Sequence, residues 1–101
     1  MTPASPPSTR TLVYRCLVRG RVQGVYYRAS ARERARAGGI RGYARNLPDG
    51  RVEVLACGEE PAVRAFIDWL WIGPSAAKVI EVDVQELQLA AHELPGDFTT
   101  A

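Results

Sequence analysis

The chain has 101 residues, of which 47% are hydrophobic and 24% are charged, and its formal net charge is +2 at pH 7. This composition is ordinary for a globular protein, and the length suits one domain with a modest core rather than two domains. No apolar run approaches the ~18 residues needed to cross a bilayer, which excludes a membrane-spanning helix.

Charge is distributed unevenly along the chain. Between residues 10 and 51, eleven arginines oppose only two acidic residues, which gives this segment a net charge of +9. From residue 52 onward, two basic residues oppose nine acidic ones, which gives −7. The positive segment would attract anions, but most of its arginines could equally form an ordinary solvated surface, and both interpretations stay open.

The first ten residues, MTPASPPSTR, contain three prolines and lack the apolar core of a secretory signal. We therefore expect a disordered leader over residues 1–10 and a folded domain over residues 11–101. For the same reason, we expect the protein to be cytoplasmic.

The first strand and helix are predicted from side-chain pattern. Residues 12–19 alternate loosely between apolar and polar side chains and end at Gly20, as a β-strand does. Residues 28–37, RASARERARA, are strong helix formers without Gly or Pro. Gly38 and Gly39 follow, where a helix commonly ends.

Two further strands and a second helix follow in the chain. The strands are expected at residues 40–46 and 51–57, because LPDG at 47–50 places Pro, Asp and Gly where a tight turn needs them. Glu, Glu and Pro at residues 59–61 suit the first turn of a helix. Apolar residues then recur at i, i+3, i+4 and i+7 from Val63, which predicts one apolar face.

The remaining residues complete the pattern of a known fold class. Gly73 and Pro74 end the second helix, and residues 78–87 alternate apolar with polar side chains as a fourth strand. Phe98 could open a fifth strand, although a frayed tail is an equally open alternative. The order strand, helix, strand, strand, helix, strand is that of an α+β split βαβ sandwich, with an antiparallel sheet and both helices on one face.

The segment GRVQGVYYR, residues 20–28, connects the first strand to the first helix. Amides at a helix start lack internal partners and carry partial positive charge, so such a loop can bind an anion. Gly20 and Gly24 allow successive amides to converge, and Arg28 could add a guanidinium that matches two phosphate oxygens. The loop lacks the glycine spacing and the Lys-Ser/Thr of a nucleotide-binding P-loop.

Three blocks of sequence resemble the acylphosphatase family: GRVQGVYYR at 20–28, GYARNLPDGRVEV at 42–54 and WIGPSAAKV at 71–79. They stand in the family's order and spacing over residues 10–87. The resemblance implies a ferredoxin-like fold and the hydrolysis of acyl phosphates to carboxylate and inorganic phosphate. It also implies that no metal or cofactor is needed.

The resemblance assigns roles to specific residues. It implies that Arg28 and Asn46 are the catalytic side chains. It further implies that the phosphate is held by backbone amides of the loop, those of Val22, Gln23, Gly24, Val25 and Tyr26. The expected ligands are a small-molecule acyl phosphate and inorganic phosphate as product and competitor, with no nucleic acid or membrane partner, and the chain is expected to be a monomer.

This small set of groups is consistent with the implied reaction. Carboxylate is a good leaving group and needs no general acid. In a loose phosphoryl-transfer transition state, Arg28 and the loop amides would hold the equatorial oxygens, while Asn46 would accept a hydrogen bond from the attacking water. Without the family resemblance, the position of Asn46 before Leu-Pro-Asp-Gly favours an ordinary turn residue that bonds its own backbone.

Several other residues are interpreted as structural. Cys16 and Cys57 are expected on opposite faces of the sheet, so they cannot pair, and two cysteines with one distant histidine do not form a metal-ligand pattern. Tyr26 and Tyr27 are assigned no catalytic role. His92 is expected to face solvent.

Some positions depart from the family pattern. Gly38 stands where relatives usually carry Leu or Ile, which would leave a cavity or a loosened helix end and cost about 2 to 4 kcal/mol. Trp71 is expected to be exposed from its helical phase, as an ordinary surface aromatic or as part of a contact patch.

Two alternative functions remain. The same fold serves as an RNA-binding module, but the open faces of the first and third strands offer no aromatic stacking platform. The chain could also be the acylphosphatase-like domain of a larger carbamoyl-transfer maturation protein. The leader and the absence of zinc-finger cysteines after the domain favour a stand-alone enzyme.

Overall fold

The computed structural model describes residues 10–100. In chain order, its elements are β1 (Thr11–Arg21), α1 (Tyr27–Ala37), β2 (Arg41–Asn46), β3 (Val52–Glu59), α2 (Glu60–Leu70), β4 (Lys78–Glu86), the 3-10 helix η1 (Ala91–Glu93) and β5 (Phe98–Thr100). The expected leader falls on residues 1–9, outside the described residues, apart from Arg10, whose carbonyl accepts a hydrogen bond from the Glu60 amide. Within residues 10–100, no helix is long and apolar enough to cross a membrane.

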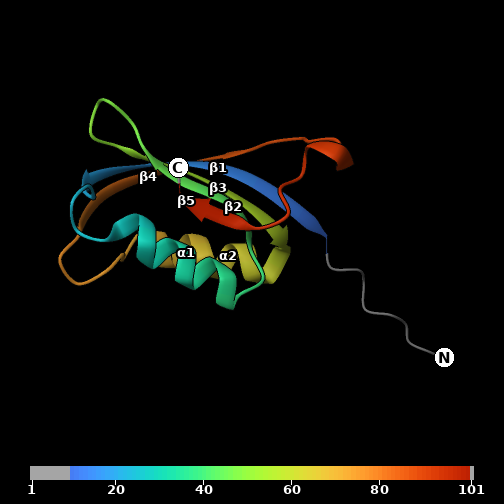
Figure 1. Ribbon diagram of the computed structural model, residues 1–101, viewed down its shortest axis with the longest axis horizontal. Helices are drawn as coiled ribbons and strands as arrows, with labels where there is room; N and C mark the ends of the chain where they lie inside the picture. Colours follow the sequence, from blue (N-terminus) through green and yellow to red (C-terminus); the bar gives the residue numbers. More distant parts are fainter. Residues whose placement is uncertain (1–9, 101) are drawn as a thin grey trace.

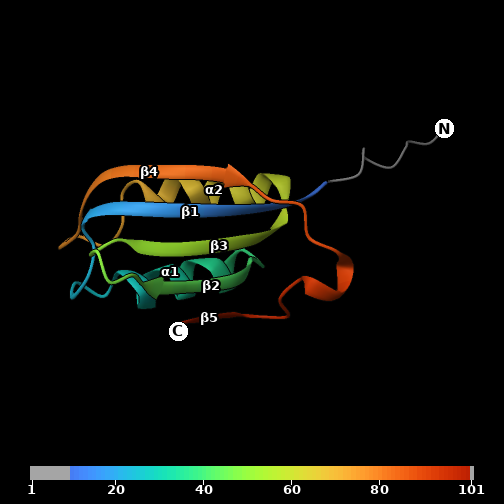
Figure 2. The same cartoon turned by 90° about the horizontal axis from the view of Figure 1, so that it is seen from above.

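The strands form one sheet in the order β4-β1-β3-β2-β5, and both helices cover the same face of it (Figures 1 and 2). The four predicted strands pair antiparallel, β1 with both β3 and β4, and β3 with β2. The ferredoxin-like α+β fold is therefore confirmed. The fifth strand also forms, because β5 pairs parallel to β2 at the edge of the sheet.

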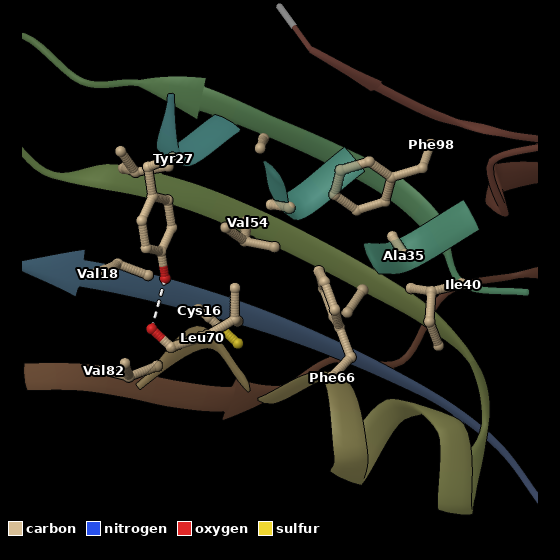
Figure 3. Close-up of a cluster of buried hydrophobic side chains, with 14 of the residues drawn as sticks. Cys16, Val18, Tyr27, Ala35, Ile40, Val54, Phe66, Leu70, Val82 and Phe98 are labelled. Carbon is tan, nitrogen blue, oxygen red and sulfur yellow. Dashed lines mark hydrogen bonds between the residues drawn. The ribbon is translucent and has the colours of Figure 1, made fainter. Parts of the chain in front are cut away.

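The main core lies between the sheet and the two helices (Figure 3). Helix α1 has the small residues Ala31 and Ala35 on its buried face, which lets its backbone approach the sheet closely. Helix α2 contributes Phe66 and Leu70, and the Phe66 ring meets the Phe98 ring edge-on at 5.7 Å between centroids. Phe98 is fully buried, so burial of its ring explains why the last strand docks.

A second, smaller apolar cluster lies on the other face of the sheet. It consists of Val13, Leu55 and Cys57, with Leu87, Leu89 and Leu94 packed against it from the segment after β4. Cys57 belongs to this cluster, whereas Cys16 lies in the main core. The prediction that the two thiols face opposite sides and stay unpaired is confirmed.

The same face carries a buried carboxylate. Glu53 on β3 is 2% exposed and accepts hydrogen bonds from the guanidinium groups of Arg15 on β1 and Arg45 on β2. Burial by itself would raise the pKa of Glu53, but the two arginines hold it below its ordinary value. The arginine pair therefore keeps Glu53 ionised and joins three adjacent strands.

The edge strand β4 contains the main difference from the predicted pattern. Of its alternating apolar residues Ile80, Val82 and Val84, only Val82 is buried, and Ile80 is 63% exposed. Ile80 is the extra residue of a β-bulge, since Arg19 pairs with Glu81 and Gly20 pairs with Val79. Alternation predicts a strand, but it does not reveal where a bulge shifts its phase.

Candidate active site

Three connections meet at one end of the sheet (Figures 1 and 2). They are the loop between β1 and α1, the turn between β2 and β3, and the loop between α2 and β4. The first contains the glycine-bearing segment, and the second directly follows Asn46. The fold thus brings the loop and Asn46 to the same end of the molecule, although more than twenty residues separate Gly24 from Asn46.

The loop between β1 and α1 has two backbone positions in the left-handed region. Gly24 has φ of +76°, and Tyr26, the N-cap residue of α1, has φ of +61°. Within residues 10–100, the amides of residues 22–26 donate to no backbone or side-chain acceptor. Since the first turn of α1 also contains no acidic residue, this end of the helix offers unpaired donors and partial positive charge to an anion.

Gly20 was expected to let the loop amides converge, but it lies within β1 and not in the loop. It lies at the bulge between β1 and β4, with φ of +135°, and a Cβ added there would stand 2.1 Å from the carbonyl oxygen of Lys78. Close approach of the two strand backbones therefore requires glycine at this position. By contrast, a Cβ added at Gly24 would meet no atom within 4 Å, so Gly24 is needed for its backbone conformation alone.

Arg28 and Asn46 line a common hollow. Its volume is about 300 Å³, and its other lining residues are Val22, Gly24, Tyr26, Tyr27 and Ala29. Two residues of the predicted set, Gln23 and Val25, are not among the lining residues. Val25 packs against the main core, and Gln23 directs its side chain to the turn between β2 and β3.

Arg28 is placed by the start of α1, as its second residue, and Asn46 is placed by the last position of β2, where it pairs with Val52. Arg28 is half-buried, whereas Asn46 is exposed. Two different elements therefore place an arginine and an asparagine in the lining of one hollow.

Tyr26 and Tyr27 have opposite environments despite being neighbours. The Tyr26 side chain is 82% exposed, whereas Tyr27 is 1% exposed and donates a hydrogen bond of 2.6 Å from its hydroxyl to the Leu70 carbonyl oxygen (Figure 3). Burial raises the pKa of Tyr27, so its hydroxyl remains a donor at neutral pH. Tyr27 thereby anchors the start of α1 to the end of α2.

A larger hollow, about 420 Å³, lies elsewhere between the two helices. It is lined by Gly38, Ile40, Phe66, Ala62 and other residues that are mostly apolar. Arg34 is the one charged residue among the described residues that line it, and its guanidinium lies over the Trp69 ring at 5.6 Å from the ring centroid. This hollow lacks the convergent polar groups that distinguish the smaller one.

Two further features of the described residues concern metal binding and the open face of the sheet. No group of three His, Cys, Asp or Glu in residues 10–100 is arranged to hold a metal ion. The open face also carries an aromatic residue on β2, Tyr43, which pairs with Leu55 of β3. The guanidinium of Arg45 covers its ring at 5.5 Å from the centroid, and Tyr43 packs against the smaller apolar cluster.

Comparison with known proteins identifies the family. The acylphosphatase family model matches residues 14–100. An acylphosphatase from Chromohalobacter salexigens is 53% identical over 87 residues, which cover 83% of this chain and 93% of that protein.

Solved structures agree with this match. An acylphosphatase from Coxiella burnetii has a TM-score of 0.83 with 34% identity, over 90% of this chain and 93% of that chain. The crystal structure of acylphosphatase from Bacillus subtilis also has a TM-score of 0.83 with 34% identity, over 89% of this chain and 98% of that chain. The chain belongs to the acylphosphatase family, and it is a hydrolase acting on acid anhydrides.

Proposed function

We propose that this protein hydrolyses acyl phosphates without a metal, using Arg28 and the loop amides to hold the phosphate and Asn46 to orient water. The observation that carries the proposal is the shared hollow, lined by Arg28, Asn46 and the loop between β1 and α1. Within residues 10–100, the amides of residues 22–26 donate to no acceptor, and three of these residues, Val22, Gly24 and Tyr26, line the same hollow. A phosphate has the charge and the acceptor oxygens that such donors select.

The reaction follows from these groups. The water oxygen attacks phosphorus in line with the bond to the acyl oxygen, a new P–O bond forms, and the bond to the acyl oxygen breaks. The carboxylate leaves with the electron pair, and the proton of the water passes to the phosphate product or to solvent. The side-chain oxygen of Asn46 accepts a hydrogen bond from the water and holds it on the attack line.

Arg28 and the amides supply the charge stabilisation. In the loose transition state, negative charge lies on the equatorial phosphate oxygens, which fixed N–H donors stabilise more strongly than water does. Because the carboxylate leaves as an anion, no proton donor is required at the leaving oxygen. These two features make the chemistry possible without a cofactor.

The first prediction concerns the two side chains of the hollow. Arg28→Ala should weaken inhibition by inorganic phosphate and lower kcat, whereas Asn46→Ala should mainly lower kcat, each by about 100- to 1,000-fold. The assay is hydrolysis of acetyl phosphate with a chelator present, with inorganic phosphate as competitor. Arg36→Ala is the matched control, since Arg36 lies on the same helix but pairs with Asp97.

Three results would overturn the proposal. Wild-type turnover in either hollow variant would remove that side chain from the reaction. Loss of activity in the chelator would show that a metal is required. An equal loss in Arg36→Ala would show that general positive charge, and not the position of Arg28, accounts for the effect.

We further propose that the protein acts as a cytoplasmic monomer with small-molecule substrates and no nucleic acid partner. The open sheet face offers little stacking surface, since Arg45 covers Tyr43. Sedimentation should give the mass of a single chain, and a larger mass at assay concentrations would contradict this proposal.

A further inference from the structure

The side chain of Gln23 links the loop to the turn that follows Asn46. Its amide nitrogen donates to the carbonyl oxygens of Leu47, at 2.9 Å, and of Arg51, at 3.0 Å. Both partners are acceptors, so the side chain must present a group with two donor hydrogens. Among uncharged side chains of this reach, glutamine meets that need.

The two carbonyls lie at the base of the turn. The Leu47 amide donates to the Arg51 carbonyl at 2.8 Å, and Asn46 pairs with Val52 in the ladder immediately before it. The hydrogen bonds of Gln23 are therefore made one residue away from Asn46 and its strand partner.

The pairing between β1 and β3 ends before this turn. The register between β1 and β3 ends at the pair of Val18 with Val52, so residues 47–51 extend beyond it. Two-stranded ribbons twist readily where a third strand no longer supports them. A link from the loop to the turn is what restrains such twisting next to Asn46.

We infer that Gln23 is a positioning residue, whose side chain holds Asn46 in register with the phosphate-binding loop. Its own main chain belongs to that loop, so one residue connects the amides that would hold the phosphate with the strand end that would hold the water. This inference rests on the function proposed above. It predicts that loss of the side chain affects turnover through Asn46 rather than affecting phosphate affinity.

The main test is a double-mutant cycle. Gln23→Ala should lower kcat for acetyl phosphate by about 10- to 100-fold, because misplacing a reacting group by about 1 Å costs this much. The inhibition constant of inorganic phosphate should change by less than about threefold, since the amides and Arg28 remain. In an Asn46→Ala background, the same substitution should lower kcat by less than about threefold, because coupled residues are not additive.

A second variant tests the hydrogen bonds themselves. Gln23→Glu has the shape of glutamine, but its ionised carboxylate has no donor and faces two carbonyl oxygens. When protonated, it regains one donor. Its kcat relative to Gln23→Ala should therefore rise as the pH falls through the titration of this carboxyl, after subtraction of the uncatalysed rate.

The outcomes separate the inference from the function on which it rests. Wild-type turnover in Asn46→Ala would overturn the proposed function. A large loss in Asn46→Ala, combined with an equal further loss from Gln23→Ala, would overturn the inference alone. A flat pH profile of Gln23→Glu relative to Gln23→Ala, or a loss confined to phosphate affinity, would also overturn it.

Discussion

Tyr27 connects the candidate active site to the core through a single hydroxyl group. The preceding residue, Tyr26, adopts a left-handed conformation that starts α1, and Tyr27 then turns inward against Trp69, with 5.8 Å between the ring centroids. Its hydrogen bond to the Leu70 carbonyl ties the first turn of α1 to the last turn of α2. The residue beside Arg28 is therefore held by the far helix as well as by its own.

We expect Tyr27→Phe to lower the free energy of unfolding by about 1–2 kcal/mol, because the ring still fills its site while the buried Leu70 carbonyl loses its donor. Urea denaturation measures the change. Tyr26→Phe is the control, since that hydroxyl belongs to an exposed side chain and its loss should change stability by less than about 0.5 kcal/mol. Equal effects of the two substitutions would contradict the assigned anchor.

At the scale of elements, the end of α1 is closed by backbone hydrogen bonds despite its two glycines. The Gly38 amide bonds the carbonyls of Arg34 and Ala35, and the Ile40 amide bonds the Ala35 carbonyl at 2.7 Å. Of the two expected consequences of glycine at this place, the structure shows the hollow between the helices and not a loosened helix end. A missing apolar side chain here affects packing more than it affects the helix.

Replacing each of the two glycines by alanine should change the free energy of unfolding in opposite directions. Gly38 has φ of −96°, and its added Cβ would stand 3.6 Å from the Arg34 carbonyl oxygen, an ordinary contact. We therefore expect Gly38→Ala to stabilise by about 0.4–1 kcal/mol, through the less flexible unfolded chain.

Gly39 has φ of +71°, and a Cβ added there would meet no atom within 4 Å. The effect of a substitution at Gly39 therefore depends on the backbone conformation alone. Gly39→Ala should destabilise by about 1–2 kcal/mol. Denaturation of both variants under one set of conditions provides the comparison. Changes of the same sign in both would show that their backbone conformations do not determine the effect.

At the scale of the whole molecule, the sheet is held from both faces. The helices bury the main core on one face, while on the other the buried Glu53 joins β1, β2 and β3 through Arg15 and Arg45. A buried carboxylate of this kind stabilises only while it is ionised and paired. The stability of the molecule should therefore depend on pH through Glu53.

The direction of that dependence follows from the lowered pKa of Glu53. A carboxyl whose pKa is lower in the folded than in the unfolded chain stabilises the fold at any pH above its unfolded-state pKa. This contribution is lost as the pH falls through the folded-state pKa. We expect the free energy of unfolding to decline below about pH 4.5. Glu53→Gln should cost about 1–3 kcal/mol at neutral pH and make the acid decline shallower.

The control for this prediction is a surface pair on the same face. Glu81 pairs with Arg19 at 3.0 Å, and its side chain is 56% exposed. Glu81→Gln should change stability by less than about 1 kcal/mol and leave the acid decline intact. If Glu53→Gln kept the full acid decline of the wild type, other carboxyls would have to cause it.

Sequence pattern by itself determined the order of the elements and the side of the sheet that faces the helices, whereas the residues of the candidate site came from the resemblance to the acylphosphatase family. The first two depend on local features: side-chain alternation in the strands, the apolar spacing of α2, and the glycine-bearing loop before α1. The opposite placement of Cys16 and Cys57 followed from the same alternation. Each of these features is visible within a short window of the chain, which is why it could be predicted.

Only the tertiary structure decided what depends on contacts between distant segments. The bulge at Ile80, the docking of Phe98 on Phe66, and the buried pairing of Glu53 all require two or more strands in a specific register. The side chain of Gln23 is the clearest case, because its two acceptors lie 24 and 28 residues further along the chain. No local pattern specifies such a partner, since the register of the sheet and the path of the loop together place it there.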